Sequence, residues 1–390
     1  MIGVYVHIPY CLKKCRYCDF VSVPIDETAG RYRSAVLREI DLSAQKYPGE
    51  RVKSVFFGGG TPTALQPDDL CAILNAIRKA FPVEPDAEIS TECNPKTVGY
   101  EGLKRLFDAG FNRLSIGLQA TQNQLLKRIG RVHTFEEFLS TYRAARDAGF
   151  TNINVDLMHG LPGQTQDDYL DAIRTVAALE PTHISAYSLI LEEGTPLYDD
   201  VLAGHETLPD PDAVADMEDA GMDLLNALGY HRYEVSNFAK PGFECRHNLI
   251  YWHNEPYLGL GAAAHSSMVE DGLWVRFSNE NSIPAYLKKL EKGRLPRAER
   301  IIINTFEQMF ESVMLGLRLT SGIDRAAFSA RFGCDVIETY QEAFDKNDRF
   351  GFWDHSDPAY LRLTRLGMDH LDSVLRDFRE RRLIDFFRPE

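Results

Sequence analysis

No uninterrupted apolar stretch of this 390-residue chain reaches the roughly 18 residues that a membrane-spanning helix needs. The N-terminal segment 1–9 lacks the basic start and the long apolar core of a secretory signal peptide. Basic residues are also scarce, because 43 lysines and arginines stand against 57 aspartates and glutamates, which gives a net charge of −14. These shortages predict a cytoplasmic protein without a transmembrane segment, and they argue against nucleic-acid binding through a broad basic face.

The chain has seven cysteines, an odd number that does not suggest a disulfide framework. Three of them, Cys11, Cys15 and Cys18, form a C-x3-C-x2-C array. Three thiolates this close leave one metal position open, which suits an iron–sulfur cluster. The alternative is a structural zinc site completed by His7, Asp19 or a distant histidine. A catalytic thiol is disfavoured, because three thiols are more than a nucleophile needs.

Short apolar runs alternate with segments whose apolar residues recur at three- and four-residue steps. The runs predict strands over residues 4–8, 52–57, 88–92, 113–118, 153–158 and 183–190. The periodic segments predict helices over residues 31–45, 67–81, 98–109, 135–148, 167–179 and 209–228. This alternation indicates an α/β protein with a parallel sheet covered by helices, arranged as an open sheet or as a full or partial barrel.

Polar or glycine-rich residues follow nearly every predicted strand. Cys11 follows the first strand, Gly58–Thr63 follows the second, and Glu92, Gln119 and Asp156 lie at or near the ends of the next three. The ligand sites of α/β barrels and open sheets lie at the carboxyl ends of the strands. We therefore expect these side chains and the cysteine array to share one face.

The cysteine array, Tyr17 just before its third cysteine and the glycines at 58–60 together resemble the radical S-adenosylmethionine (SAM) family. That resemblance implies a [4Fe–4S] cluster held by Cys11, Cys15 and Cys18, with SAM chelating the fourth iron. Further segments are similar to the coproporphyrinogen-oxidase-like branch, namely residues 5–11, 58–63, 92–95, 115–119 and 156–163. The branch implies a partial (β/α)6 barrel, which we place at residues 1–235. A small, mostly helical, winged-helix-like domain at residues 300–390 is expected after it.

The same resemblance implies a set of SAM contacts: Tyr5, Tyr17, Phe20, Gly59, Gly60, Thr61, Glu92, Gln119, Arg131 and Asp156. Glu92 or Asp156 could accept hydrogen bonds from ribose hydroxyls or from the amine, and Arg131 could pair with the carboxylate. Taken singly, each of these charged residues is better explained by an ordinary surface or rim ion pair.

Two kinds of protein occupy this branch, the oxygen-independent coproporphyrinogen III oxidases and the HemW-type heme chaperones. The oxidases carry a further cysteine where this chain has Phe20, and an N-terminal extension for which the ten residues before Cys11 are too few. The segment 247–252 reads His-Asn-Leu-Ile-Tyr-Trp and fits the HNxxYW motif associated with heme in the chaperones. These features favour a chaperone over an enzyme.

In the heme interpretation, His247 is the axial ligand of the iron, and Tyr251 and Trp252 offer flat apolar faces to the porphyrin. His253, His265 and Cys245 are substitute ligands. In the competing interpretation the two aromatic residues only pack in the interior and the histidine is hydrogen-bonded in a loop.

The expected function is therefore binding of a [4Fe–4S] cluster, SAM and heme, followed by transfer of heme to an acceptor hemoprotein such as a respiratory enzyme. Coproporphyrinogen III decarboxylation, or another radical SAM reaction of heme metabolism, is the alternative. The resemblance also implies a homodimer, and nothing in the composition indicates or opposes peripheral membrane contact.

Residues 236–299 carry the HNxxYW motif and are interpreted as an aromatic and glycine-rich cap, irregular over residues 242–268. Within it, residues 259–264 match the dinucleotide fingerprint G-x-G-x-x-A. The match does not open a strand–helix–strand unit, so we interpret its glycines as sites of close backbone packing near the cluster.

Overall fold

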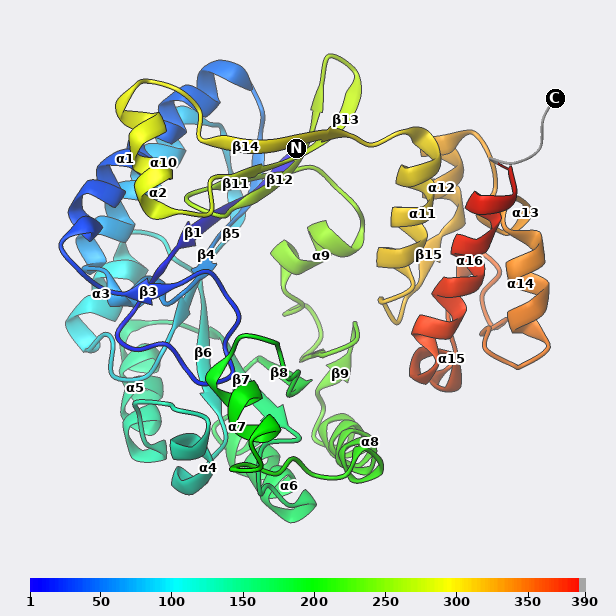
Figure 1. Ribbon diagram of the computed structural model, residues 1–390, viewed down its shortest axis with the longest axis horizontal. Helices are drawn as coiled ribbons and strands as arrows, with labels where there is room; N and C mark the ends of the chain where they lie inside the picture. The colour runs from blue at the N-terminus through cyan, green and yellow to red at the C-terminus, as the bar shows by residue number, and fades with distance from the viewer. Residues whose placement is uncertain (386–390) are drawn as a thin grey trace.

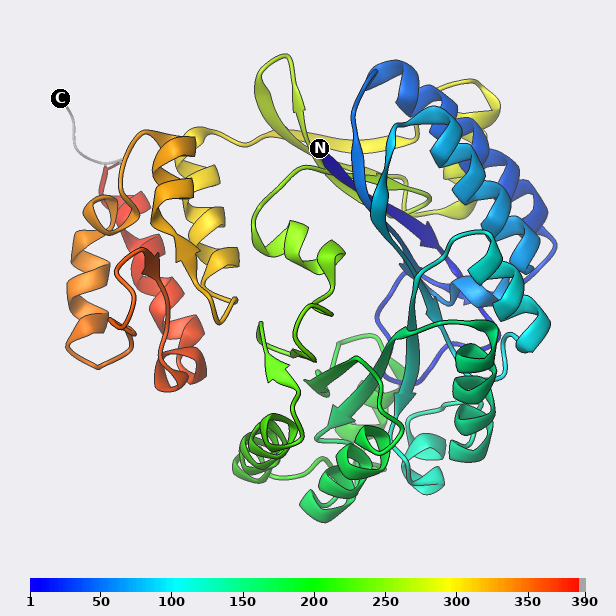
Figure 2. The same cartoon turned by 180° about the vertical axis from the view of Figure 1, so that it is seen from behind.

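A curved sheet of parallel strands with helices along its outer side forms the body of the molecule (Figures 1 and 2). The computed structural model describes the backbone of residues 1–385 and the side chains of residues 1–379. The central strands are β1 (Ile2–Ile8), β4 (Val52–Gly59), β5 (Val83–Cys93), β6 (Arg113–Gln119), β7 (Asn152–His159) and β8 (His183–Ser188). The helices between them are α1 (Thr28–Lys46), α2 (Pro67–Ala80), α3 (Tyr100–Asp108), α4 (Asn123–Arg128), α5 (Phe135–Ala148) and α6 (Gln166–Ala177).

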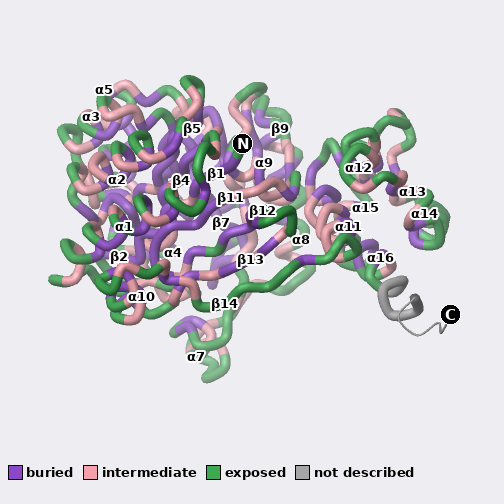
Figure 3. Tube along the Cα trace, turned by 90° about the horizontal axis from the view of Figure 1, so that it is seen from above, coloured by how far each residue is buried: buried purple, intermediate pink, exposed green. Residues whose placement is uncertain are grey.

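Neighbouring central strands pair in parallel and in sequence order, which confirms the predicted partial barrel. The strands are buried nearly throughout, and in β6 every residue is buried. Figure 3 shows this buried layer inside a more exposed shell. Local signals fix the helix starts, since Thr134 and Glu137 form a capping box at α5, and Thr165 and Asp168 form another at α6.

The sheet continues beyond the barrel on both sides. On one side β11 (Tyr257–Leu260) pairs in parallel with β1, and β12 (His265–Glu270), β13 (Leu273–Asn279) and β14 (Arg297–Ile302) follow in antiparallel order. On the other side β10 (Asn237–Ala239) and β9 (His231–Arg232) extend β8. The sheet of the described residues therefore runs β14-β13-β12-β11-β1-β4-β5-β6-β7-β8-β10-β9. Helix α8 (Pro211–Ala227) packs on α6 and α10 (Ile283–Glu291) packs on α1, while α7 (Pro196–Leu202) follows β8 in the chain.

The expectation of an irregular cap over residues 242–268 is wrong, because this segment contains helix α9 (Arg246–Trp252), strand β11 and part of β12. The strands form because β1 leaves an unpaired edge that β11 satisfies with backbone hydrogen bonds. The interpretation of the glycines is confirmed. A Cβ at Gly261 would lie 2.5 Å from the His7 carbonyl oxygen, and one at Gly259 would lie 2.1 Å from that of His265.

The C-terminal unit is mostly helical and lies to one side of the barrel (Figure 1). It comprises α11 (Thr305–Gly316), β15 (Ile323–Asp324), α12 (Arg325–Phe332), α13 (Val336–Thr339), α14 (Gln341–Asp348), β16 (Tyr360–Leu361), α15 (Arg365–Asp369) and α16 (Leu371–Asp385). A separate hydrophobic cluster that includes Val313, Trp353 and Val374 stabilises it. The pairing of β15 with β16 and a bridge between Trp353 and Leu363 supply the small strands of a winged-helix-like unit. Among the described helices, none is both long and apolar enough to cross a bilayer.

Candidate cofactor site

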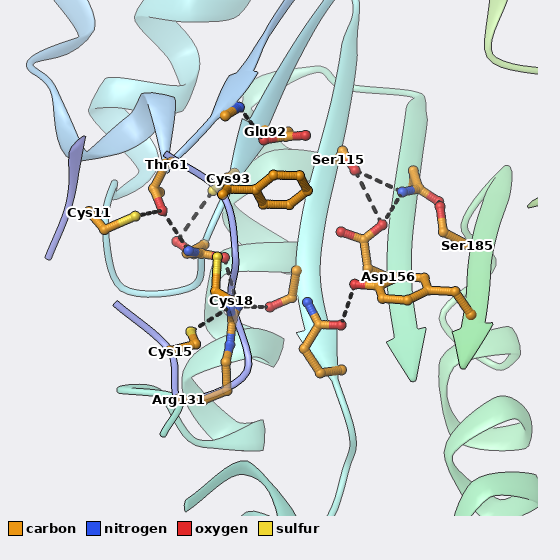
Figure 4. A pocket seen from close by; sticks show the side chains of 18 of the residues that line it. Cys11, Cys15, Cys18, Thr61, Glu92, Cys93, Ser115, Arg131, Asp156 and Ser185 are labelled. Atoms are coloured by element: carbon orange, nitrogen blue, oxygen red, sulfur yellow. Dashed lines mark hydrogen bonds between the residues drawn. The ribbon is translucent and has the colours of Figure 1, made fainter. Parts of the chain in front are cut away.

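The cysteine array lies in a loop at the carboxyl end of β1, between the short paired strands β2 (Tyr10–Cys11) and β3 (Val23–Pro24). Backbone hydrogen bonds close its base, from Val23 N to Pro9 O at 2.8 Å and from Ile25 N to Cys11 O at 2.9 Å. Cys11 is buried, Cys15 and Cys18 are half-buried, and all three are free thiols. Figure 4 shows the three on the same side of a pocket, with Asp156 and Ser185 across from them. The fold therefore gathers the thiols at one face, as predicted.

Three side chains connect two of the thiols through hydrogen bonds, and we call them the thiol bracket: Thr61, Asn94 and Arg131. Thr61 Oγ1 donates to Cys11 Sγ at 3.4 Å, and Asn94 Nδ2 donates to Thr61 Oγ1 at 2.7 Å. Arg131 donates to Asn94 Oδ1 at 2.7 Å and to Cys15 Sγ at 3.5 Å. The bracket ties the two thiols together and brings a hydrogen-bond donor to each sulfur.

His7 does not offer a nitrogen to a metal. Its Nδ1 is hydrogen-bonded to Tyr5 Oη at 2.9 Å, and its Nε2 to Val21 O at 2.9 Å. Asp19 is exposed at the outside of the loop. Across the described residues, no three histidine, cysteine, aspartate or glutamate side chains gather where one metal ion could be held. A cubane cluster takes one thiolate at each of three corners, so its ligands stand further apart than those of a single ion.

The glycine segment at the end of β4 packs directly against the cysteine loop. Gly60 N donates to Ile8 O at 2.8 Å, and Thr61 N donates to Tyr10 O at 2.7 Å. Gly59 has a φ of +107°, and a Cβ there would lie 2.4 Å from the His7 ring. Close approach of neighbouring groups therefore requires glycine in this segment, and Gly59 and Gly60 form part of the cavity wall.

A cavity of about 430 Å³ opens between the cysteine loop and the inner face of β4 to β8. Nearly all the expected SAM contacts line it: Tyr17, Phe20, Gly59, Gly60, Thr61, Glu92, Gln119, Arg131 and Asp156. Tyr5 is the exception among them, because its hydroxyl is turned to His7 and its ring faces Phe56. The structure thus brings the expected residues together, while the contacts to SAM themselves stay predictions.

Two half-buried carboxyl groups face this cavity. Glu92 accepts a hydrogen bond from Gly59 N at 3.2 Å, and burial, assisted by the charge of Asp156, raises the pKa of Glu92 to about 8. Burial also raises the pKa of Asp156, which accepts a hydrogen bond from Asn154 Nδ2 at 2.7 Å. Within the described residues neither carboxylate has an ion-pair partner within 4.0 Å. Their placement favours a ligand that carries positive charge.

Further polar residues in the cavity wall escaped the sequence analysis: Asn94, Arg113, Ser115, Asn154, Ser185, Tyr187, Asn237 and Asn248. Most lie at alternate positions of otherwise apolar strands, such as Arg113 and Ser115 in β6. Successive side chains of a strand point to opposite faces, so polar residues two apart share the inner face. That alternation was the signal available in the sequence.

The HNxxYW motif forms helix α9, which packs inside the barrel against the beginnings of β1 and β4. His247 is 1% exposed, stacks on Phe56, and has both ring nitrogens engaged, Nδ1 with Ser54 Oγ at 2.7 Å and Nε2 with Tyr251 Oη at 2.9 Å. Trp252 is half-buried, and its Nε1 has no hydrogen-bond partner among the described atoms. These contacts match the interpretation in which the motif packs in the interior. Because both ring nitrogens of His247 are hydrogen-bonded, neither is free for a heme iron in this arrangement.

A partial parallel barrel with three thiols at its carboxyl end defines the radical SAM class, and residues 5–176 match the family model of the radical SAM superfamily. Residues 305–370 match the HemN C-terminal domain. The chain is 38% identical over 339 residues to the heme chaperone HemW of Bacillus subtilis, covering 85% of this chain and 87% of that protein. It is 36% identical over 388 residues to the Escherichia coli heme chaperone HemW, covering 97% and 98%. The chain therefore belongs to the HemW family.

The fold is also similar to the solved structure of the coproporphyrinogen III oxidase HemN from Escherichia coli. The two match with a TM-score of 0.83 at 23% sequence identity, over 97% of this chain and 89% of that one. At this identity the similarity establishes the shared fold, and it accounts for the oxidase as the alternative function.

Proposed function

We propose that this protein is a heme chaperone that holds a [4Fe–4S] cluster and SAM, binds heme as cargo and transfers it to an acceptor hemoprotein. The observation that carries the proposal is the loop of three free thiols at the mouth of the cavity, in a chain whose relatives are named heme chaperones. The absence of a fourth cysteine at Phe20, which is 68% exposed, favours a chaperone over an oxidase.

The residues present fit the cluster and SAM. Cys11, Cys15 and Cys18 supply three soft ligands, which leaves one iron for SAM, and the bound cluster can pass an electron to SAM. The two half-buried carboxyl groups, Glu92 and Asp156, can accept hydrogen bonds from the amine or ribose of SAM and complement its sulfonium charge. Gly59 and Gly60 line the cavity without side chains, which permits close approach of the methionyl group.

The test is anaerobic reconstitution with iron and sulfide, followed by titration with heme and observation of the Soret band. We expect a cluster spectrum that disappears in the triple Cys→Ser variant, and a Soret shift on adding heme. Wild-type protein that takes up no heme would refute the carrier function. One zinc per chain without acid-labile sulfide would refute the cluster.

The oxidase alternative predicts a different result on the same reconstituted material. An anaerobic assay with coproporphyrinogen III would then yield protoporphyrinogen through loss of two propionate carboxyl groups. Robust turnover would replace the chaperone function with the enzymatic one, whereas heme uptake without turnover supports the chaperone.

Three further points belong to this proposal. The free thiols are suited to a reducing compartment, and we place the protein in the cytoplasm. A homodimer and a respiratory hemoprotein as acceptor follow from the family resemblance. Sedimentation of the heme-loaded protein with and without an apo-hemoprotein tests both, since heme transfer would move Soret absorbance to the acceptor.

A further inference from the structure

Cys18 is the cysteine of the array that the thiol bracket does not reach, since the bracket joins Cys11 to Cys15. Cys18 follows Cys15 by one tight turn, which a hydrogen bond from Cys18 N to Cys15 O at 3.3 Å closes. Arg16 and Tyr17 are the two middle residues of this turn. A cluster needs all three thiolates at its corners, so the place of the Cys18 sulfur depends on what holds the turn.

The backbone of Arg16 joins this turn to two segments that are distant in sequence. Arg16 N donates to Ile129 O at 3.1 Å, and Leu197 N donates to Arg16 O at 2.9 Å. Gly130 approaches so closely that a Cβ there would lie 2.9 Å from Arg16 Cγ. The turn is therefore held between the α4–α5 connection and the beginning of α7.

The side chain of Arg16 reaches the same two segments. Its guanidinium forms ion pairs with Asp200 and, at 3.3 Å, with Glu206, and it donates a hydrogen bond to Arg128 O at 2.5 Å. The side chains of Arg16, Asp200 and Glu206 are 29%, 32% and 13% exposed, so water screens these pairs less than fully exposed ones. We call residues 195–206, which include α7, the clasp.

The clasp projects from the barrel, as α7 does in Figure 3. Thr195 and Leu197 are buried at the beginning of the helix, whereas Leu202 at its end is 70% exposed. Asp200 and Glu206, in the second half of the clasp, both turn back to Arg16. The ion pairs therefore tie the outer part of the clasp to the cysteine turn.

We propose that the clasp holds the turn Cys15–Cys18 in the shape that a cluster requires, with Arg16 as the positioning residue for the Cys18 thiolate. The inference rests on the proposed function, because it concerns the residues that would hold the [4Fe–4S] cluster. Arg16 acts through the backbone of the turn, two residues before Cys18. Without the clasp, Cys11 and Cys15 stay joined by the thiol bracket, and Cys18 is free to move.

The chain offers a matched control in Asp199, which precedes Asp200 on the same helix. Asp199 is exposed, and its carboxylate has no hydrogen bond or ion pair within the part of the chain that the structure describes. Asp199→Asn and Asp200→Asn therefore remove the same charge from the same turn of α7. They differ in that the second substitution breaks the ion pair with Arg16.

The experiment follows the decay of cluster absorbance after an iron chelator is added to the reconstituted full chain. We expect Asp200→Asn to lose the cluster about three- to fivefold faster than wild type, Arg16→Gln about tenfold faster, and Asp199→Asn at the wild-type rate. The double variant of Arg16 and Asp200 should decay no faster than Arg16→Gln alone, because both changes break one contact. Equal rates in Asp199→Asn and Asp200→Asn would overturn the inference and leave the carrier function standing.

A measurement on the cluster-free protein separates positioning from a general loosening of the fold. Iodoacetamide alkylates the thiols, and mass spectrometry of the peptides gives a rate for each cysteine. In Asp200→Asn we expect Cys18 to react about threefold faster, while Cys11 and the half-buried Cys71 of α2 keep their wild-type rates. Equal acceleration of all three would overturn the positioning role. If this labelling pattern is found but wild-type protein takes up no cluster, the proposed cofactor fails, whereas the hold of the clasp on the turn is supported.

Discussion

When SAM binds, we expect the Glu92 carboxyl to release one proton, and replacing Glu92 by glutamine should abolish that release. Burial gives Glu92 a pKa of about 8, so the carboxyl is mostly neutral at neutral pH before a ligand arrives. The sulfonium charge of SAM favours the ionised carboxylate, and at about pH 6 that ionisation costs about 3 kcal/mol, or roughly a hundredfold in affinity. SAM affinity should therefore rise by up to about tenfold per pH unit between about pH 6 and pH 8, and then level off.

Calorimetric titration of SAM into cluster-loaded protein measures this directly, in two buffers of different ionisation enthalpy. Wild type should release close to one proton more per SAM than Glu92→Gln at about pH 6.5, because any proton lost by the chelating amine of SAM is common to both proteins. Glu92→Gln should therefore bind SAM with a weaker dependence on pH than wild type, whereas Glu101→Gln, at an exposed position of α3, should match wild type. Proton-neutral binding by wild type, with an affinity independent of pH, would refute the assignment of this carboxyl to the ligand.

The raised pKa of Glu92 also has a consequence for stability. Its contribution to folding is fully present below its ordinary pKa of 4.5 and is lost as the pH rises through about 8, because the unfolded carboxyl ionises more readily. Glu92→Gln should therefore lose less stability than wild type between about pH 5 and pH 9, which urea unfolding at several pH values measures. Parallel pH profiles of the two proteins would contradict this.

Three other substitutions test the loop and the domain contact. Gly59→Ala should lower the free energy of unfolding, measured by urea titration, by about 3 kcal/mol, because the new Cβ would meet the His7 ring. Gly49 also has a positive φ but faces open space, so Gly49→Ala should lower the same free energy by only about 1 kcal/mol. Similar losses would mean that the clash is relieved at no cost. Asn94→Ala removes the middle residue of the thiol bracket and should lower the free energy of unfolding by about 2–3 kcal/mol. It should also speed the loss of the reconstituted cluster to a chelator, followed by the decay of cluster absorbance. An unchanged rate of decay would show that the bracket does not support the cluster. Arg365→Ala removes two exposed ion pairs with α8 and should lower the free energy of unfolding by less than about 1 kcal/mol. We therefore expect limited proteolysis to release the C-terminal unit at the wild-type rate. Faster release would contradict this and show that the ion pairs hold the unit in place.

The HNxxYW segment shows where sequence reasoning stops. The motif marks His247 as a polar residue among aromatics, and that pattern fits an axial ligand and a packing histidine equally well. The choice depends on partners distant in sequence, since Ser54 from β4 occupies one ring nitrogen. His133, by contrast, lies in no recognisable sequence motif. Only the folded chain shows that neither of its ring nitrogens has a hydrogen-bond partner among the described residues.

The sequence by itself determined a parallel sheet covered by helices, the position of the thiols after the first strand and the glycines after the second, because these follow from local periodicity and from the rule that ligands meet the carboxyl ends of strands. Periodicity left open sheet and barrel undecided, and the partial barrel was expected only from the family resemblance. Only the tertiary structure decided which side chains share hydrogen bonds, as in the thiol bracket that joins Cys11 to Cys15, and that residues 257–302 extend the sheet. Hydrogen bonding and burial depend on groups brought together from distant parts of the chain, and no local pattern records them.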